Sequence, residues 1–532
     1  KTKVLIMQQD LISIKDASKW ISIELKKDIT PSNISYLINY GRIRKYGDNG
    51  DTFVSKQEVR DYYYSYYGSR SNNWKEKLGN DIDWHLSFEN YKESETTKHV
   101  HRLHPYKGKF IPQLVEYFLD DHIDEFKREV FFKKDDIILD PFCGSGTTLV
   151  QSNELGINAI GIDVSQFNSL ISNVKIDKYD FKNLEIEINS ISAALRKFIT
   201  NSNTVKFEKQ LLERLNEFNS KYFPSPEFKI KVNKKEIDEL KYGLQKEKEF
   251  LTTYKELIKE FKIELNQFNS ESFLDKWFLK HIRTEIDFVF ELIKKIKNQN
   301  SKKIISVILS RTIRSCRATT HSDLATLIEP VTTTYYCSKH GKICKPLFSI
   351  QSWWERYSKD TLKRLKEFDL LRTNTFQHCF TGDSRTIDLF AAVEKTNKDF
   401  ANKLKNQKIQ GIFTSPPYVG LINYHEQHAY AYDLFGFKRM DELEIGPLFK
   451  GKGKEAKESY VDGIVSVLNN CKKFLAKDYN IFIVANDKHN LYPVIAEKSG
   501  MKIIQQFKRP VLNRSEKDKN AYSESIFHFK EK

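Results

Sequence analysis

A glycine-rich turn between a strand and a helix constrains the fold of this 532-residue chain more than any other feature. The apolar run Ile137–Leu139 predicts a buried strand, and Asp140–Thr148 (Asp-Pro-Phe-Cys-Gly-Ser-Gly-Thr-Thr) leads from its end into a predicted helix, Thr147–Leu155. A second buried strand, Ala159–Ile162, follows and ends at Asp163. Strand, helix and strand at this spacing predict a parallel β-α-β unit, and therefore an α/β fold.

The same turn predicts a binding site. Glycines let a ligand approach the backbone closely, and the N-terminus of the following helix adds N–H donors and a positive dipole. Asp163 lies 23 residues after Asp140 at the end of the next strand, where a carboxylate can accept hydrogen bonds from a ribose. The spacing fits a nucleoside cofactor.

A second motif lies far downstream, again directly after a buried strand. The strand Gly411–Phe413 is followed by Thr414-Ser415-Pro416-Pro417-Tyr418. Together with Asp140–Thr148, this motif resembles the amino-methyltransferases of DNA, which use S-adenosylmethionine to methylate exocyclic amines. The resemblance implies a Rossmann-like class I methyltransferase fold, an α/β fold with a seven-stranded, mostly parallel sheet. It also implies double-stranded DNA as substrate and a restriction–modification system with a cognate restriction endonuclease as genetic partner.

The resemblance assigns catalysis to Ser415, Pro416, Pro417 and Tyr418. An aromatic amino group is a poor nucleophile because its lone pair is delocalised into the ring. The Ser415 hydroxyl and the Pro416 carbonyl would accept its two hydrogens and favour a pyramidal nitrogen, while Tyr418 offers a face on which a flipped base stacks. No thiolate is needed, and the Pro-Cys dipeptide of cytosine-C5 enzymes does not occur in the sequence.

The first residue of the catalytic motif bears on the target base. Serine there resembles the N4-cytosine branch of the family, whereas aspartate or asparagine is more usual in the N6-adenine branch. We therefore expect transfer to the N4 amine of a flipped cytosine, with N6-adenine as the alternative. A catalytically inactive DNA-binding regulator that retains the fold, and an enzyme acting on structured RNA, are further alternatives.

Further segments extend the resemblance to the cofactor site. The segment His104–Leu114 precedes the first strand, where the family covers the methionine end of the cofactor, and Thr381–Ser384 resembles a third motif whose Asp383 accepts from the adenine amino group. The expected residues for binding S-adenosylmethionine are Lys109, Phe110, Pro112, Asp140, Pro141, Phe142, Gly144, Gly146, Thr147, Asp163, Asp383 and Thr414.

The remaining sequence divides the chain into four expected parts. Residues 1–70 form a small module, 71–179 carry the cofactor motifs, 180–350 are a helical insertion and 351–532 carry the catalytic motif. In the module, helices at Ile12–Ile21 and after Thr30-Pro31-Ser32 precede a basic hairpin that turns at Asp48-Asn49-Gly50. This order resembles an excisionase-like winged helix-turn-helix, in which Arg42, Arg44 and Lys45 would contact DNA phosphates.

We expect the insertion to supply a second DNA contact. Only 31 positions separate Asp383 from Thr414, too few for a target-recognition region between these motifs. The chain has 87 Lys+Arg and 71 Asp+Glu, a net charge of +16 that favours a polyanionic partner. The basic segments and side chains expected to contact DNA are Lys229–Lys235, Lys294–Lys297, Arg311, Arg314, Arg317 and the loop Lys450–Lys454.

The composition indicates a reducing cytoplasm, and the resemblance implies a bacterial host and activity at the nucleoid. The mean hydropathy is −0.56 and no apolar run reaches the length of a membrane span, so we expect no membrane association. The six cysteines are too few and too unevenly spaced for a disulfide scaffold.

We assign no metal from the sequence. His425 and His428 are three residues apart, not four as in a zinc helix, and we expect them on a helix beside the target-base pocket. Cys337, His340 and Cys344 have the ligand types for zinc, with Cys316 or His321 as a possible fourth, but their spacing is irregular.

Overall fold

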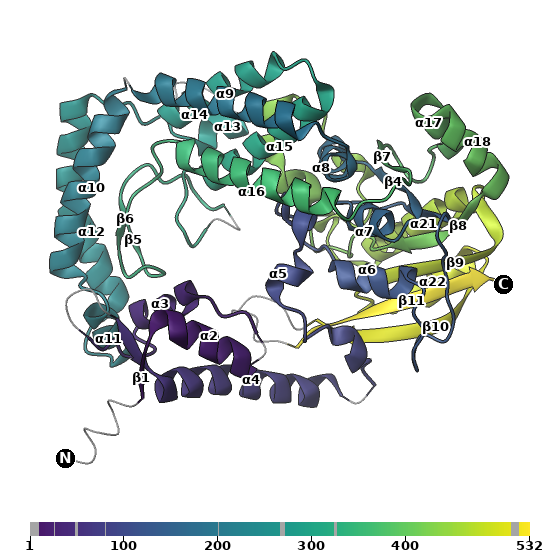
Figure 1. Cartoon of the computed structure of the whole chain (residues 1–532), viewed down its shortest axis with the longest axis horizontal. Coiled ribbons are helices and arrows are strands. Elements are labelled where there is room, and N and C mark those ends of the chain that lie inside the picture. The colour runs from purple at the N-terminus through teal and green to yellow at the C-terminus, as the bar shows by residue number, and fades with distance from the viewer. Residues whose placement is uncertain are drawn as a thin grey trace.

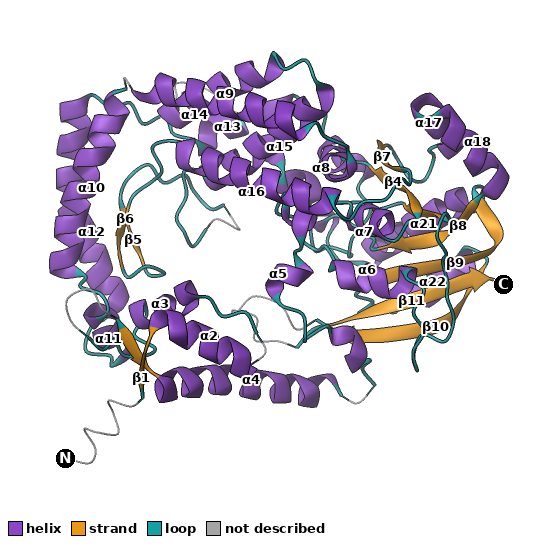
Figure 2. Cartoon of the chain, viewed as in Figure 1, coloured by secondary structure: helices purple, strands orange, loops and turns teal. Residues whose placement is uncertain are grey.

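A seven-stranded sheet forms the right-hand part of the molecule in Figures 1 and 2. The computed structural model describes residues 10–25, 27–47, 52–79, 81–200, 202–266, 272–323, 327–511 and 521–532. In spatial order the strands are β10 (Met501–Pro510), β11 (Ser523–Glu531), β9 (Leu475–Ala485), β8 (Ile409–Thr414), β3 (Ile137–Asp140), β4 (Asn158–Asp163) and β7 (Gln377–Thr381). The strands from β9 to β7 run parallel, and β11 pairs antiparallel with both β9 and β10. The expected mostly parallel sheet is confirmed.

The order of the strands determines where a ligand can bind. From β3 the chain first adds β4 and β7 on one side, and later β8 and β9 on the other. The carboxyl ends of β3 and β8 are therefore neighbours at a reversal of strand order, where open α/β sheets usually hold their ligands. Asp140 ends β3 and Thr414 ends β8, so the two sequence motifs begin at this point.

Helices cover both faces of the sheet because the side chains of each strand alternate between two apolar cores. Ile138 faces the core that contains α6 (Pro112–Leu119), α7 (Thr147–Glu154) and α8 (Gln166–Ile176). Ile137 and Leu139 face the opposite core. Its helices are α17 (Leu389–Thr396), α18 (Lys398–Gln407), α21 (Lys454–Lys472) and α22 (Tyr492–Lys498).

The insertion is helical, as expected, and continues the first of these cores. Its elements are α9 (Phe181–Thr200), α10 (Asn203–Tyr222), α11 (Glu227–Asn233), α12 (Glu239–Phe261), α13 (Phe273–Trp277), α14 (Lys280–Lys294), α15 (Gln299–Ser315), β5 (Tyr335–Cys337) and β6 (Lys342–Cys344). α15 packs on α8, and α16 (Gln351–Asp369) packs on α9 and α15. No helix in the described part of the chain is long and apolar enough to cross a membrane.

The N-terminal module contains the two expected helices, α2 (Ile14–Leu25) and α3 (Pro31–Asn39), between β1 (Leu11–Ser13) and β2 (Phe53–Ser55). Thr30 caps α3, because its hydroxyl accepts from the N–H of Asn33 at 3.3 Å. The expected hairpin is reduced to a bridge between Tyr46 and Phe53, and its turn at residues 48–50 lies outside the described residues. α4 (Lys56–Leu78) then runs through the expected boundary at residue 70.

Two sets of contacts connect this module to the rest of the chain. At one end Asn233 of α11 donates to the carbonyl of Tyr40 at 3.0 Å. Beyond α4, the backbone N–H of Asp83 donates to the carbonyl of Lys508 of β10 at 2.7 Å. The backbone N–H of Lys508 in turn donates to Asp83 Oδ2 at 2.7 Å. The module therefore joins the far end of the insertion to the sheet, and Figure 1 shows the three parts arranged as a ring.

Candidate active site

A buried hydrogen bond joins the two sequence motifs. The Thr414 hydroxyl donates to Asp140 Oδ1 at 2.6 Å across 274 positions of sequence, and the N–H of Phe142 approaches the same oxygen at 3.2 Å. Burial raises the pKa of Asp140 to about 6, although these donors oppose the shift. The adjacency of β3 and β8 thus brings both motifs to one point.

One pocket opens where the motifs meet. The expected residues that line it are Lys109, Phe110, Pro141, Phe142, Gly144, Thr147, Asp163, Asp383, Ser415 and Pro417. The expected residues that are not among its described lining residues are Pro112, Asp140, Gly146, Thr414, Pro416 and Tyr418. Pro112 is buried at the first turn of α6, and Pro416 is buried between Ser415 and Pro417.

The two glycines of the turn, Gly144 and Gly146, have different structural roles. Gly144 has φ of 52°, and a Cβ there would lie 3.0 Å from the hydroxyl of Tyr106, which also lines the pocket. Gly146 has φ of 74°, and a Cβ there would lie 2.9 Å from Ser172 of α8. Gly144 therefore keeps the pocket open, whereas Gly146 lets α8 pack closely against the turn.

Asp163 already has partners within the protein. Its two carboxylate oxygens accept from the N–H of Gly144 at 2.8 Å, the N–H of Ser165 at 2.8 Å and the amide of Asn168 at 3.1 Å. Burial raises its pKa to about 6. The carboxylate thus fixes the glycine-rich turn against the end of β4. The hydroxyls of a ribose would donate to carboxylate oxygens that already accept these three hydrogen bonds.

The third motif is fixed to the first one. Asp383 is ion-paired with Arg385, whose Nη2 lies 2.8 Å from Oδ2. Burial acts to raise the pKa of Asp383, but the hydrogen bonds and charge of Arg385 outweigh it and lower the pKa. The hydroxyl of Ser384 donates to the carbonyl of Pro141 at 2.6 Å, which holds the end of β7 beside the turn.

Lys109 supplies a cation to the pocket wall. Its Nζ donates to the carbonyl of His101 at 2.7 Å. Burial and the positive charges of Arg102 and Arg364 lower its pKa to about 8. Phe110 beside it packs edge-to-face on Phe413 of β8, with ring centroids 5.5 Å apart.

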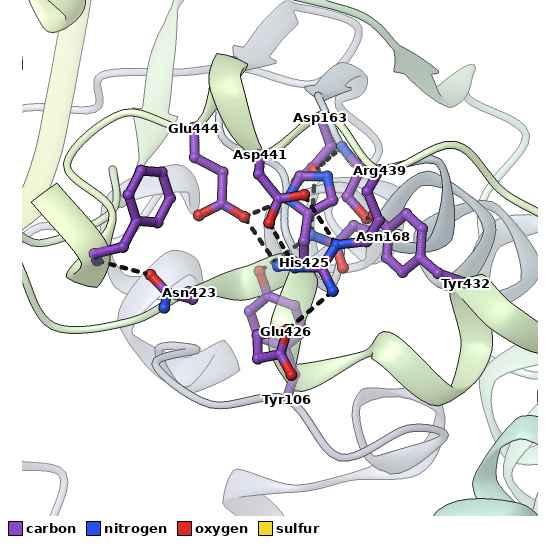
Figure 3. A network of polar contacts seen from close by, with 12 residues as sticks. Tyr106, Asp163, Asn168, Asn423, His425, Glu426, Tyr432, Arg439, Asp441 and Glu444 are labelled. Atoms are coloured by element: carbon purple, nitrogen blue, oxygen red, sulfur yellow. Dashed lines mark hydrogen bonds and ion pairs between the residues drawn. The ribbon is translucent and has the colours of Figure 1, made fainter. Parts of the chain in front are cut away.

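Another part of the pocket wall contains residues that the sequence motifs do not indicate. Figure 3 shows them gathered around His425, which lies in the short helix α19 (Tyr424–Gln427) and whose backbone N–H donates to Glu444 Oε1 at 2.9 Å. The ring Nδ1 of His425 contacts the same oxygen. Among the described residues, no partner is found for His425 Nε2, Glu444 Oε2 or Asn168 Oδ1. The sequence predicts His425 on a helix beside the target-base pocket, but no sequence motif predicts Glu444.

Tyr418 is oriented from the last strands of the sheet. Its hydroxyl donates to Glu524 Oε1 of β11 at 3.0 Å, and Glu524 Oε2 lies 3.8 Å from Nε of the buried Arg509 of β10. No sequence motif indicates Glu524 or Arg509. The hydroxyl of Tyr418 therefore has a fixed partner, which restricts the rotation of its ring.

The basic residues separate into exposed and buried sets. Arg42, Arg44 and Lys45, which we call the basic loop, are exposed, and Arg44 approaches Glu58 at 3.7 Å with 73% of its side chain accessible. The loop at 450–454 is also largely exposed and packs against Gly420, near the catalytic motif.

Three cations of the insertion differ from the sequence expectation because they are buried. Arg311 is ion-paired with Asp360 at 2.6 Å, Lys229 is ion-paired with Glu239, and Arg317 is 8% exposed. A buried charge needs partners within the protein, and a side chain buried in this way is not available to DNA. The sequence expectation of DNA contacts at these three positions is wrong.

The chain is similar to DNA methylases and to type II methyltransferases. Residues 26–173 match the family model described as DNA methylase. The type II methyltransferase M.MjaII of Methanocaldococcus jannaschii is 48% identical over 524 residues, which are 98% of this chain and 97% of that protein. The type II methyltransferase M.MvaI of Kocuria varians is 32% identical over 117 residues, 22% of this chain and 24% of its own. No solved structure matches the chain at a significant level.

Proposed function

Because this chain belongs to the family of type II DNA methyltransferases, we propose that it transfers the methyl group of S-adenosylmethionine to the exocyclic N4 amine of a flipped cytosine in double-stranded DNA. The observation that carries the proposal is that Gly144 and Ser415 line the same pocket. A glycine-rich turn for a nucleoside and a serine-proline motif for an amine are of use together only if the two ligands react with each other.

The polar atoms of the pocket fit S-adenosylmethionine. The unpartnered oxygens of Asn168 and Glu444 are acceptors, suited to the ammonium group and to ribose hydroxyls, and Lys109 is a donor suited to a carboxylate. When bound, the cofactor supplies an electrophilic methyl group on a sulfonium. We propose that Phe142 and Asp383 bind its adenine side, because both line the pocket and a hydrogen bond from Ser384 to the carbonyl of Pro141 joins their two segments.

Ser415 and its neighbours would act on the amine. The Ser415 hydroxyl and the Pro416 carbonyl accept its two hydrogens and direct the nitrogen lone pair toward the methyl donor. Pro417 keeps this backbone rigid, and Tyr418, oriented by Glu524, stacks on the flipped base. The acceleration then comes from orientation and electrostatic complementarity, with no covalent enzyme intermediate.

The DNA would lie across the mouth of the pocket, between the N-terminal module and the sheet. The basic loop would contact phosphates as the wing of a helix-turn-helix, and the exposed loop at 450–454 would lie beside the flipped base, next to Gly420. The exposed Lys294, Lys295 and Lys297 remain candidates within the insertion. A restriction endonuclease of the same specificity would be the genetic partner.

Incorporation of labelled methyl groups tests the function. We expect the purified chain to transfer label from S-adenosylmethionine to duplex DNA, and sequencing of modified bases to locate N4-methylcytosine in one recognition sequence. Ser415→Ala should lower kcat at least about 100-fold, as removal of a preorganised polar group commonly does. Ser466→Ala, at an exposed serine on α21, is the matched control and should retain wild-type activity.

Three outcomes would contradict parts of this proposal. Absence of label in DNA contradicts methyl transfer to DNA, and N6-methyladenine in the product contradicts the choice of cytosine. Equal activity of Ser415→Ala and Ser466→Ala contradicts the assigned catalytic role.

A further inference from the structure

Four side chains with zinc-ligand chemistry converge beside the small sheet β5–β6, outside the pocket described above. His321, Cys337, His340 and Cys344 each place one nitrogen or sulfur atom within 4.8 Å of the other three. We propose that these residues bind a structural Zn²⁺ ion. Two thiolates and two imidazoles form a common ligand set of structural zinc sites.

The distances between ligand atoms agree with a shared ion. Nδ1 of His340 lies 3.5 Å from Sγ of Cys337 and 3.4 Å from Sγ of Cys344. In a tetrahedral site with Zn–S of about 2.3 Å and Zn–N of about 2.1 Å, nitrogen and sulfur ligands lie about 3.6 Å apart. One imidazole nitrogen has a single lone pair or a single proton, so it cannot make a full hydrogen bond to both sulfurs at once.

The fourth ligand is oriented by a neighbour. Nδ1 of His321 lies 2.8 Å from the hydroxyl of Tyr335, and this hydroxyl also accepts from the backbone N–H of His321 at 3.2 Å. An Nδ1–H that donates to Tyr335 leaves the lone pair on Nε2, the nitrogen that remains for a metal. Histidines that bind metals usually donate their other N–H to such a partner.

The segment between α15 and α16 needs a cross-link of this kind. Its described part contains only β5 and β6, strands of three residues each, and such a hairpin is marginal without further support. The apolar cluster under it consists of Tyr335, Cys337 and Cys344, with Val331 beside them. Two of these residues are the proposed thiolate ligands, so the ion would hold this face of the hairpin together, whereas Ile343 and Tyr336 on its other face pack on the main core.

The hairpin in turn organises the arm formed by α10, α11 and α12. Asn219 of α10 exchanges two hydrogen bonds of 3.0 Å with the backbone of Ile343. Lys229 of α11 donates to the carbonyl of Ser338 at 2.8 Å, inside the proposed chelate loop. Because α11 also carries the contact to the N-terminal module, the ion would fix the corner of the ring where these parts meet.

Metal content of the full-length chain tests the proposal. After purification without added metal, inductively coupled plasma mass spectrometry should find about one zinc ion per chain. Cys337→Ser and Cys344→Ser should each lower this content at least about tenfold, because each removes a thiolate ligand. Cys316→Ser is the matched control, since Cys316 is a buried free cysteine outside the cluster, and it should retain the zinc.

A second measurement keeps the test decisive if the cysteine variants do not fold. The wild-type chain refilled with Co²⁺ should show the intense visible bands of tetrahedral Co²⁺ and thiolate-to-metal charge transfer. Three results would overturn the proposal: a wild-type chain that holds no zinc even after incubation with the ion, zinc content that both cysteine variants retain, or a Cys337–Cys344 disulfide in the purified protein.

Discussion

The buried carboxyl group of Asp140 offers a quantitative test of how the two motifs are joined. Burial raises its pKa from 3.8 to about 6, so the native state holds this proton more tightly than the unfolded state does. The free energy of unfolding must then fall as pH rises from about 4 to about 6. At about 1.4 kcal/mol per pKa unit, the ionised carboxylate costs the native state about 3 kcal/mol above this range.

Asp140→Asn removes this charge and keeps the shape of the side chain. Thr414 and Phe142 can still donate to the amide oxygen, and the hydroxyl of Thr148 can accept from the amide nitrogen. We therefore expect the variant to be more stable than the wild type by up to about 3 kcal/mol at pH 8 and equal to it within about 0.5 kcal/mol at pH 4. Urea unfolding followed by tryptophan fluorescence at both pH values measures the difference.

Thr414→Val is the converse experiment. It leaves the buried carboxylate of Asp140 without its shortest donor, and we expect a loss of about 1.5–3 kcal/mol at pH 8. At pH 4 the carboxyl is neutral in the native state and the loss should shrink to about 1 kcal/mol.

One result for Asp140→Asn would refute the argument from burial. If this variant is less stable than the wild type at pH 8, the carboxylate stabilises the fold as an ion.

Three further predictions concern the DNA interface, the cofactor site and the turn. Replacing all three cations of the basic loop by alanine should weaken DNA binding and reduce the slope of log K against log salt by about 2.7, measured by fluorescence anisotropy; an unchanged slope would remove this loop from the interface. Because the pKa of Lys109 is lowered to about 8, affinity for S-adenosylmethionine should fall between pH 7 and 9 more steeply in the wild type than in Lys109→Gln, measured by calorimetry; parallel profiles would contradict a contact to the carboxylate. Gly146→Ala should destabilise the chain by about 1–3 kcal/mol, because position 146 combines a positive φ with a close contact to α8. Gly453→Ala is the control, because a Cβ there would meet open space. Equal unfolding midpoints of the two variants would refute the prediction.

Some features of the site could be predicted from the sequence because they depend on local patterns. A short apolar run followed by Asp140 and glycines predicts a strand, a tight turn and a helix from neighbouring residues alone. The run before Thr414 predicts another buried strand in the same way. Since the carboxyl ends of parallel strands meet at one edge of a sheet, these two observations already indicate a common site.

Other features depend on contacts that local patterns do not encode. Glu444 meets His425 and Glu524 meets Tyr418 only after loops and strands from different parts of the chain have packed. Their chain neighbours carry no periodic or motif signal that would distinguish them from surface acids. The burial of Lys229 is a similar case, because a run of lysines looks solvated until its partner, Glu239, is known.

The sequence by itself determined the α/β class of the fold and the positions of the buried strands that end before Asp140, Asp163 and Thr414, because each strand is encoded within about ten consecutive residues. Only the tertiary structure decided which charges are buried, that Glu444 pairs with His425, and that His321 rather than Cys316 joins Cys337, His340 and Cys344. The physical reason is that burial and pairing are set by side chains far apart in sequence, whose positions depend on how every intervening element packs.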